Sequence, residues 1–315
     1  MLAAVNRVRD HQWSMGHVLK EVAMQVGVIG LGAMGNGMAA NLAAAGLLAG
    51  VWNRTQSKAA AFAAEHGVTH FADPAALAAA VDVVITSVSA DADLLEVIES
   101  LHGALSPGTV VVDTSTVAPE TAVRAAERLR SGGGELLDAP VSGGPEGACQ
   151  GSLVMMVGGE AEVLERIRPL LDPISRAVYH MGPVGTGQAT KAVNQIAVAG
   201  VMQGVAAGLA YARQQGLDVG QVVEVIGGGA ASSWQLVQRG PNVAQEHFPP
   251  GFKLQLHRKD LEIVRAALRA RGCALELIER TLADYDALIE QGYADEDISA
   301  LYRLRRDELA ALAQQ

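Results

Sequence analysis

The chain has 315 residues, of which 50% are hydrophobic and 18% charged, so we expect two domains with ample cores and no extended disorder. Its net charge is −10, from 24 basic and 34 acidic residues, and no basic run stands out, which argues against a nucleic-acid partner. The two cysteines and eight histidines form no metal-ligand spacing or disulfide framework. We therefore expect no catalytic metal and a cytoplasmic location.

Residues 1–23 precede the first predicted strand. They carry charged side chains such as Arg7, Arg9 and Lys20 and lack a continuous apolar stretch, so no secretory signal is predicted. We expect either an extension of uncertain order or a short amphipathic helix on the outside of the fold.

Residues 26–46 read VGVIGLGAMGNGMAANLAAAG, a strand, a glycine-rich turn, a helix and a helix stop. In that context a GxGxxG match is a strong sign of a dinucleotide site. Gly30 allows the tight turn, Gly32 lets the backbone approach a pyrophosphate, and Gly35 lets the helix pack on the strand. The predicted phosphate site comprises Gly30, Leu31, Gly32, Ala33, Met34 and Gly35.

The end of the second strand indicates which dinucleotide binds. A carboxylate about 20 residues after the glycine loop would accept the 2′-hydroxyl of NAD, and no acid stands there. The positions instead carry Asn53, Arg54, Thr55 and Lys58, and the planar fork of arginine suits a 2′-phosphate. We expect NADP(H), with NAD(H) as the alternative.

Strands and helices alternate up to residue 180, which predicts an α/β fold with a doubly wound parallel sheet. The predicted strands are Leu48–Trp52, Val83–Val88, Thr109–Val112, Leu136–Asp138, Leu153–Val157 and Ala177–His180, with helices at Ser57–His66, Pro74–Ala80 and Pro119–Ser131.

From the breaker cluster at residues 182–187 onward the sequence is helical throughout. We therefore predict a Rossmann-type domain over residues 24–185 and an all-helical substrate and oligomerisation domain over 186–315. The first helix of the second part, about residues 188–215, is apolar but contains Asn194, Gln195 and Gln203. It is too interrupted to predict a membrane span, so we expect a buried helix of a soluble protein.

Gly200, Gly204 and Gly208 share one face of that helix. Glycine is unfavourable in helix interiors, so the row indicates that another helix crosses very closely. We expect a homodimer or homotetramer built on this face. The alternative is packing against other helices of the same subunit.

Four separated segments together resemble the β-hydroxyacid dehydrogenase family. They are GLGAMG at 30–35, DAPVSGGPEGACQGSLVMMVGG at 138–159, GTGQATKAVNQ at 185–195 and KDL at 259–261. The resemblance runs from residue 24 to about residue 304. Members include 3-hydroxyisobutyrate dehydrogenase, tartronate semialdehyde reductase and glyoxylate or succinic semialdehyde reductases.

By this resemblance Ser142, Gly143 and Gly144 hold the substrate carboxylate. The residues make physical sense in that role, because a hydroxyl and glycine N–H groups bind an anion without bulk. We predict that Ser142–Gly144 form a turn after a strand that ends in Asp138-Ala139-Pro140-Val141, at the carboxyl edge where doubly wound sheets bind ligands.

Lys191 aligns with the family's catalytic lysine. A lysine near a helix start and partly buried should lose its proton more easily than the usual pKa of about 10.4 implies, as a general acid/base requires. Many members have two asparagines at the third and fourth positions after the lysine, whereas this chain has Asn194 and Gln195. We expect Gln195 to fill the hydrogen-bonding position and leave the division of labour between the two open.

The remaining candidate residues also follow from the resemblance. Lys259 and Thr116 are expected beside the nicotinamide, with Asp260 orienting its neighbours. Val88 lies in a loop that lacks the family's usual proline, so we leave that loop's shape open. Trp234 is expected to line the substrate pocket from the helical domain.

The sequence thus predicts an NADP(H)-dependent oxidoreductase that interconverts a small hydroxy acid and its semialdehyde, without a membrane partner. An imine reductase is the first alternative, because residues 52–55 (WNRT) also resemble that class. A non-catalytic NADP-binding module is the second, and it is disfavoured because such proteins lack the lysine.

Overall fold

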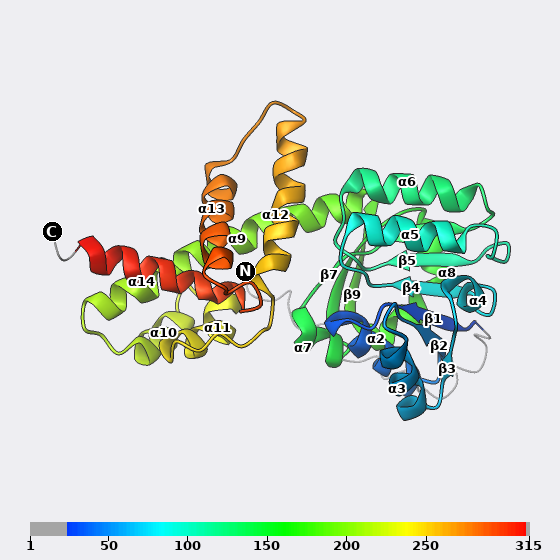
Figure 1. The fold of residues 1–315 in the computed structure, drawn as a ribbon, viewed down its shortest axis with the longest axis horizontal. Coiled ribbons are helices and arrows are strands. Elements are labelled where there is room, and N and C mark those ends of the chain that lie inside the picture. The colour runs from blue at the N-terminus through cyan, green and yellow to red at the C-terminus, as the bar shows by residue number, and fades with distance from the viewer. Residues whose placement is uncertain (1–23, 313–315) are drawn as a thin grey trace, which may run out of the picture.

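The computed structural model describes residues 24–312, so the prediction for residues 1–23 lies outside the described part of the chain. An α/β region is followed by a helical region, and the long helix α9 (Thr186–Gln214) runs from the first into the second (Figure 1). This arrangement confirms the predicted fold class. The proposed domain limits stay a prediction, with α9 beginning one residue past the expected junction.

A nine-stranded sheet forms the first region, in the order β3-β2-β1-β4-β5-β6-β8-β7, with β9 on β8. The strands are β1 (Val26–Ile29), β2 (Leu48–Trp52), β3 (Thr69–His70), β4 (Val83–Thr86), β5 (Val110–Asp113), β6 (Glu135–Asp138), β7 (Val141–Ser142), β8 (Leu153–Gly158) and β9 (Ser175–Gly182). The pairings from β3 to β6 are parallel, but β8 is antiparallel to both β6 and β7.

The sheet is therefore mixed rather than purely parallel. The sequence reading also missed β3 and β7, each of which has only two residues and thus no periodicity to read. The expectation that Ser142 lies in a turn is wrong. The chain continues in the same direction from β6 through Ala139-Pro140 into β7, and Ser142 ends β7, paired with Val154 of β8, so the turn begins at Gly143.

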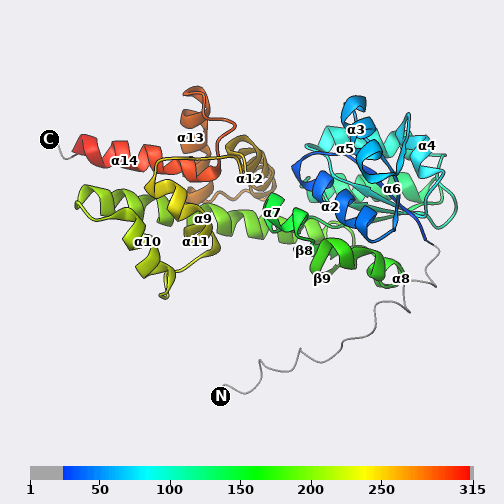
Figure 2. The ribbon, with the colours of Figure 1, turned by 90° about the horizontal axis from the view of Figure 1, so that it is seen from below.

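Helices cover both faces of the sheet (Figures 1 and 2). They are α2 (Ala33–Ala44), α3 (Gln56–His66), α4 (Pro74–Ala78), α5 (Asp91–Leu101), α6 (Pro119–Arg130), α7 (Gly144–Cys149) and α8 (Ala161–Leu171). One apolar core joins the sheet to α2, α3 and α8, and a second joins it to α4, α5 and α6. The strands β1, β4 and β5 are fully buried, which explains their continuous apolar runs.

The helical region has its own core. Its further helices are α10 (Val219–Gly227), α11 (Trp234–Ala244), α12 (Leu254–Arg269), α13 (Glu276–Glu290) and α14 (Leu301–Leu312). Between residues 183 and 312 the only strand-like pairing is an isolated bridge between Lys253 and Asp297.

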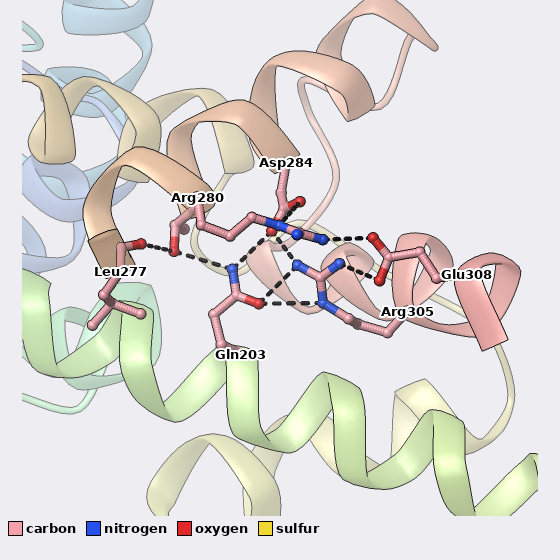
Figure 3. Close-up of polar contacts among 7 residues, drawn as sticks. Gln203, Leu277, Arg280, Asp284, Arg305 and Glu308 are labelled. Atoms are coloured by element: carbon pink, nitrogen blue, oxygen red, sulfur yellow. Dashed lines mark hydrogen bonds and ion pairs between the residues drawn. The ribbon is translucent and has the colours of Figure 1, made fainter. Parts of the chain in front are cut away.

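A polar cluster fastens α9 to α13 and α14 (Figure 3). Gln203 of α9 donates to Asp284 of α13 at 2.9 Å and accepts from Arg305 of α14 at 2.9 Å, while Arg305 also pairs with Asp284. Each of these buried groups has a partner, so their burial carries little penalty. One face of α9 is fixed in this way.

Another face of α9 is open. Val193 is 66% exposed and Tyr211 56% exposed, and a Cβ added at Gly204 or Gly208 would have no atom of the described residues outside the helix's own backbone within 4 Å. The expectation of a buried helix is therefore wrong for this face, and so is a close crossing at these two glycines by another described helix of the subunit. By length and composition alone, α9 is long and apolar enough to cross a membrane, a criterion that core helices of soluble proteins also meet. Of its most apolar 18-residue segment, 28% is buried.

Candidate active site

The glycine loop joins β1 to the start of α2, and each glycine has a distinct surrounding. Gly30 has φ +97°, and a Cβ there would lie 2.2 Å from the carbonyl oxygen of Ser87. A Cβ at Gly35 would lie 1.9 Å from the carbonyl oxygen of Gly30. A Cβ added at Gly32 would have no atom of the described residues within 4 Å apart from its chain neighbours. Two glycines are thus required by packing, while the third leaves room at a helix N-terminus, where a pyrophosphate fits.

The predicted ribose site lies beside this loop. Asn53 accepts a hydrogen bond from the Leu31 N–H at 2.8 Å, so it fixes the loop rather than facing solvent. Arg54 is 77% exposed and pairs with Asp93 of α5 at 2.9 Å, a partner that the sequence reading missed. Thr55 and Lys58 are exposed. Two cations and two amide or hydroxyl groups therefore lie at the end of β2, where the ribose site is predicted.

The ends of β4 and β5 are tied together by Asp113, which is completely buried. Its Oδ1 accepts from Thr86 Oγ1 and from Ser115 Oγ, each at 2.7 Å. Ser115 Oγ in turn accepts from the Val88 N–H at 2.9 Å, which fixes the loop whose shape the sequence left open. Burial raises the pKa of Asp113 against the lowering effect of these hydrogen bonds.

Lys191 lies in the second turn of α9 and is only 8% exposed. Its Nζ donates to the carbonyl oxygen of Val141 at 2.8 Å, immediately before Ser142. Burial lowers the pKa of Lys191, Lys259 lowers it further, and Asp260 opposes both. The fold thus brings the predicted acid/base to the predicted carboxylate loop.

Asp138, at the end of β6, fixes the start of α9. It accepts from the backbone N–H of Gly185 at 2.7 Å and of Gln188 at 2.8 Å, as an anion at a helix N-terminus should. Burial raises the pKa of Asp138 to about 6, against those two hydrogen bonds. Gln188 also donates to the Ser115 carbonyl at 2.8 Å. Neither residue was assigned a role from sequence, because their partners lie about 50 and 70 residues away.

Asn194 and Gln195 form a chain that leads to Asp260. Asn194 Nδ2 donates to Gln195 Oε1 at 2.8 Å, and Gln195 Nε2 donates to Asp260 Oδ2 at 2.6 Å. Gln195 is almost completely buried and Asn194 half-buried. In this arrangement Gln195 positions its neighbours, and Asn194 is the more accessible of the two.

Lys259 connects α12 to the loop after β5. Its Nζ donates to the carbonyl oxygen of Thr116 at 2.5 Å and lies 3.0 Å from Asp260. Lys259 and Thr116 are half-buried. The structure therefore brings together the two residues that were expected beside the nicotinamide.

Trp234 begins α11 and is 49% exposed. The guanidinium of Arg239 lies 5.0 Å from its ring centroid and also pairs with Glu146 of α7 at 3.0 Å. Since α7 begins at Gly144, Trp234 is linked through Arg239 to the predicted carboxylate loop.

A cavity of about 500 Å³ lies elsewhere, at the C-terminal end of α9 against α10 and α11. Within residues 24–312 no group of three His, Cys, Asp or Glu side chains is arranged to hold a metal ion.

The site has a glycine-rich loop between a strand and a helix, and a buried lysine on the helix that links the two regions. Polar groups converge on it at the strand ends. Together these features define a nicotinamide-dinucleotide oxidoreductase. The comparisons specify the class further. Residues 25–182 match the NAD binding domain of 6-phosphogluconate dehydrogenase. Residues 185–305 match the NAD-binding domain of NADP-dependent 3-hydroxyisobutyrate dehydrogenase.

Full-length relatives agree. The chain is 37% identical to the 2-hydroxy-3-oxopropionate reductase of Escherichia coli over 257 residues, 81% of this chain and 87% of that protein. It is 34% identical to the NAD-dependent L-serine dehydrogenase of Pseudomonas aeruginosa, over 89% of this chain and 97% of that one. The structure of Mycobacterium tuberculosis 3-hydroxyisobutyrate dehydrogenase with L-serine matches with TM-score 0.81 and 32% identity, covering 90% of this chain and 99% of that one.

The chain belongs to the β-hydroxyacid dehydrogenase family, and it is an NAD(P)-dependent oxidoreductase acting on CH–OH groups.

Proposed function

We propose that the protein interconverts a small hydroxy acid, similar to 3-hydroxyisobutyrate, glycerate or hydroxybutyrate, and its semialdehyde, with Lys191 as general acid/base. The observation that carries the proposal is the buried Lys191 ammonium beside the Val141 carbonyl, next to Ser142 and Gly143. The names of the relatives point to the same size of substrate. The reaction class favours a cytoplasmic enzyme.

The residues divide the work. Ser142, Gly143 and Gly144 bind the substrate carboxylate through a hydroxyl and backbone N–H groups. Lys191 takes the hydroxyl proton during oxidation and donates a proton to the carbonyl oxygen during reduction. Asn194 orients the substrate, and Gln195 with Asp260 holds Asn194 in place. A bound nicotinamide dinucleotide supplies the hydride chemistry.

The experiment that tests this function is a turnover assay. The purified protein is given a panel of hydroxy acids and semialdehydes with NADP(H) and NAD(H), beside a cyclic imine. Turnover of at least one semialdehyde or hydroxy acid is expected. Turnover of the imine alone would support an imine reductase. Cofactor binding without any turnover would support the non-catalytic alternative.

We further propose a preference for NADP(H), supported by the exposed Arg54 and Lys58 at the ribose position. Changing Arg54→Ala should lower kcat/KM for NADPH by about tenfold, because one charge-assisted contact to a 2′-phosphate is removed. The value for NADH should change little. Both cofactors are measured on wild type and variant, with Arg128→Ala, an exposed arginine of α6, as control. A wild-type preference for NADH would contradict the assignment.

Finally, we propose a homodimer or homotetramer in which the open face of α9 contacts another subunit. Support comes from exposed Val193, Val201 and Tyr211 beside two uncovered glycines. An exposed apolar patch of this kind commonly marks a protein–protein interaction site.

Gly204→Leu is expected to shift the protein to smaller species in light scattering at fixed concentration. A Cβ there would have no atom of the described residues outside its own helix backbone within 4 Å, and leucine suits a helix better than glycine, so the isolated chain should stay folded. Gly204→Ala serves as a graded control with a smaller effect. An unchanged molar mass in the leucine variant, or a monomeric wild type, would reject this interface.

A further inference from the structure

The substrate loop carries an acidic residue that the proposed chemistry does not use. Glu146 lies in the first turn of α7, two residues after Gly144. Its Oε2 is 2.8 Å from the position that a Cβ on Gly144 would take, so the carboxylate folds back over the loop. If this loop binds a carboxylate, as the proposed function holds, Glu146 places a like charge beside it. Such a pair repels when both groups are charged and close.

Arg239 of α11 supplies the opposite charge. It is 12% exposed, and its Nη1 donates to Glu146 Oε1 at 3.0 Å. Its Nε lies 3.3 Å from Asp297 Oδ2. Asp297 is almost fully buried and also accepts from the N–H groups of Phe252 and Ser299. Those two bonds stabilise the buried Asp297 carboxylate, and Arg239 is shared between Asp297 and Glu146, with its Nη1 directed at Glu146.

The position of Arg239 is fixed from several sides. Its guanidinium lies 5.0 Å from the Trp234 ring centroid, within the range of a cation–π contact. A Cβ on Gly251 would lie 2.3 Å from Arg239 Nη2, so the glycine makes room for this side chain. Because these contacts already restrict the Arg239 side chain at the junction of the two regions, its pairing with Glu146 costs little additional conformational entropy.

We propose that Arg239 is a specificity-determining residue, which neutralises Glu146 and so allows the Ser142–Gly144 loop to accept a negatively charged substrate. Without Arg239 the Glu146 charge opposes the substrate carboxylate. The same loop then favours an uncharged ligand of equal shape. The Arg239–Glu146 ion pair thus favours binding of an acid over its ester. Neither residue belongs to the predicted set of substrate-binding residues.

The test compares 3-hydroxybutyrate with its methyl ester, which differ in charge. Binding to the NADP⁺ complex is measured by calorimetry, so the readout does not depend on turnover. Arg239→Met should weaken binding of the acid relative to the ester by about tenfold, equivalent to roughly 1.4 kcal/mol. Glu146→Gln should leave or strengthen binding of the acid. The double variant should return to within about twofold of wild type, because both charges are gone.

Two further measurements keep the outcome decisive. Arg128→Met removes an exposed Arg–Glu pair of α5 and α6 and should not change the acid-to-ester ratio. Because Arg239→Met leaves Asp297 without its cation, thermal unfolding is followed for every variant. Glu146→Gln keeps the Arg239–Asp297 contact, and Arg239→Lys, which keeps the charge, should retain most of the preference for the acid.

Two results have different meanings. In the first, the wild type prefers the acid, but Arg239→Met weakens binding of the acid and of the ester equally, or Glu146→Gln does not restore the preference. That result would overturn the role of Arg239 alone. A wild type that binds both ligands equally would overturn the carboxylate role of the loop, and with it both this inference and the proposed function.

Discussion

Lys191→Met is expected to lower kcat by about 10²–10⁴-fold while leaving NADPH affinity nearly unchanged. The ammonium is the group that we assign to proton transfer, and methionine keeps most of the apolar stem of the side chain in a site that is almost closed to solvent. The hydrogen bond to the Val141 carbonyl is lost. Single-turnover kinetics and a cofactor titration separate the two effects.

Lys253→Met is the matched control, since it removes an exposed lysine from the start of α12 and should keep full activity. A Lys191→Met variant that retains more than about a tenth of wild-type kcat would contradict the assigned role.

The pH dependence of activity is a second, independent test of the acid/base role of Lys191. Burial lowers the pKa of Lys191 from its ordinary value of 10.5. During oxidation the unprotonated amine is the base, so kcat/KM should rise with pH and level off above that lowered pKa. During reduction the protonated form is the acid, so activity should fall through the same range. Both pH limbs should disappear in Lys191→Met.

Gly32→Val is expected to raise the dissociation constant for the dinucleotide by about 100-fold or more, while thermal stability stays close to wild type. Apart from its chain neighbours, no atom of residues 24–312 lies within 4 Å of a Cβ at this position, and its φ of −71° suits any residue, so the isolated fold accepts the side chain. The valine instead occupies the space through which the backbone approaches a pyrophosphate. Loss of one or two charge-assisted hydrogen bonds accounts for this magnitude.

Gly35→Val provides the contrast. Its side chain meets the Gly30 carbonyl oxygen, so that variant should lose thermal stability together with cofactor binding. Calorimetric titration and thermal unfolding are measured on both variants. Cofactor affinity near the wild-type value in Gly32→Val would place the pyrophosphate elsewhere.

The sequence predicted the features that depend on neighbours along the chain. The glycine loop, the longer strands and the helices for which limits were predicted lie within a few residues of those limits, because hydrophobic period and breaker residues are local signals. The start of α9 was predicted for the same reason. The resemblance to a family added the pairing of Lys191 with the Ser142 loop, which no local pattern contains.

Only the tertiary structure decided which side chains meet across the domains. Nothing local indicates that Asp138 fixes the start of α9, that Gln195 faces Asp260, or that Glu146 pairs with Arg239 93 residues away. The same holds for the open face of α9, since glycines spaced by four residues fit a covered and an uncovered helix equally. Sequence period determines which residues share a face, whereas the packing of distant elements determines what that face contacts.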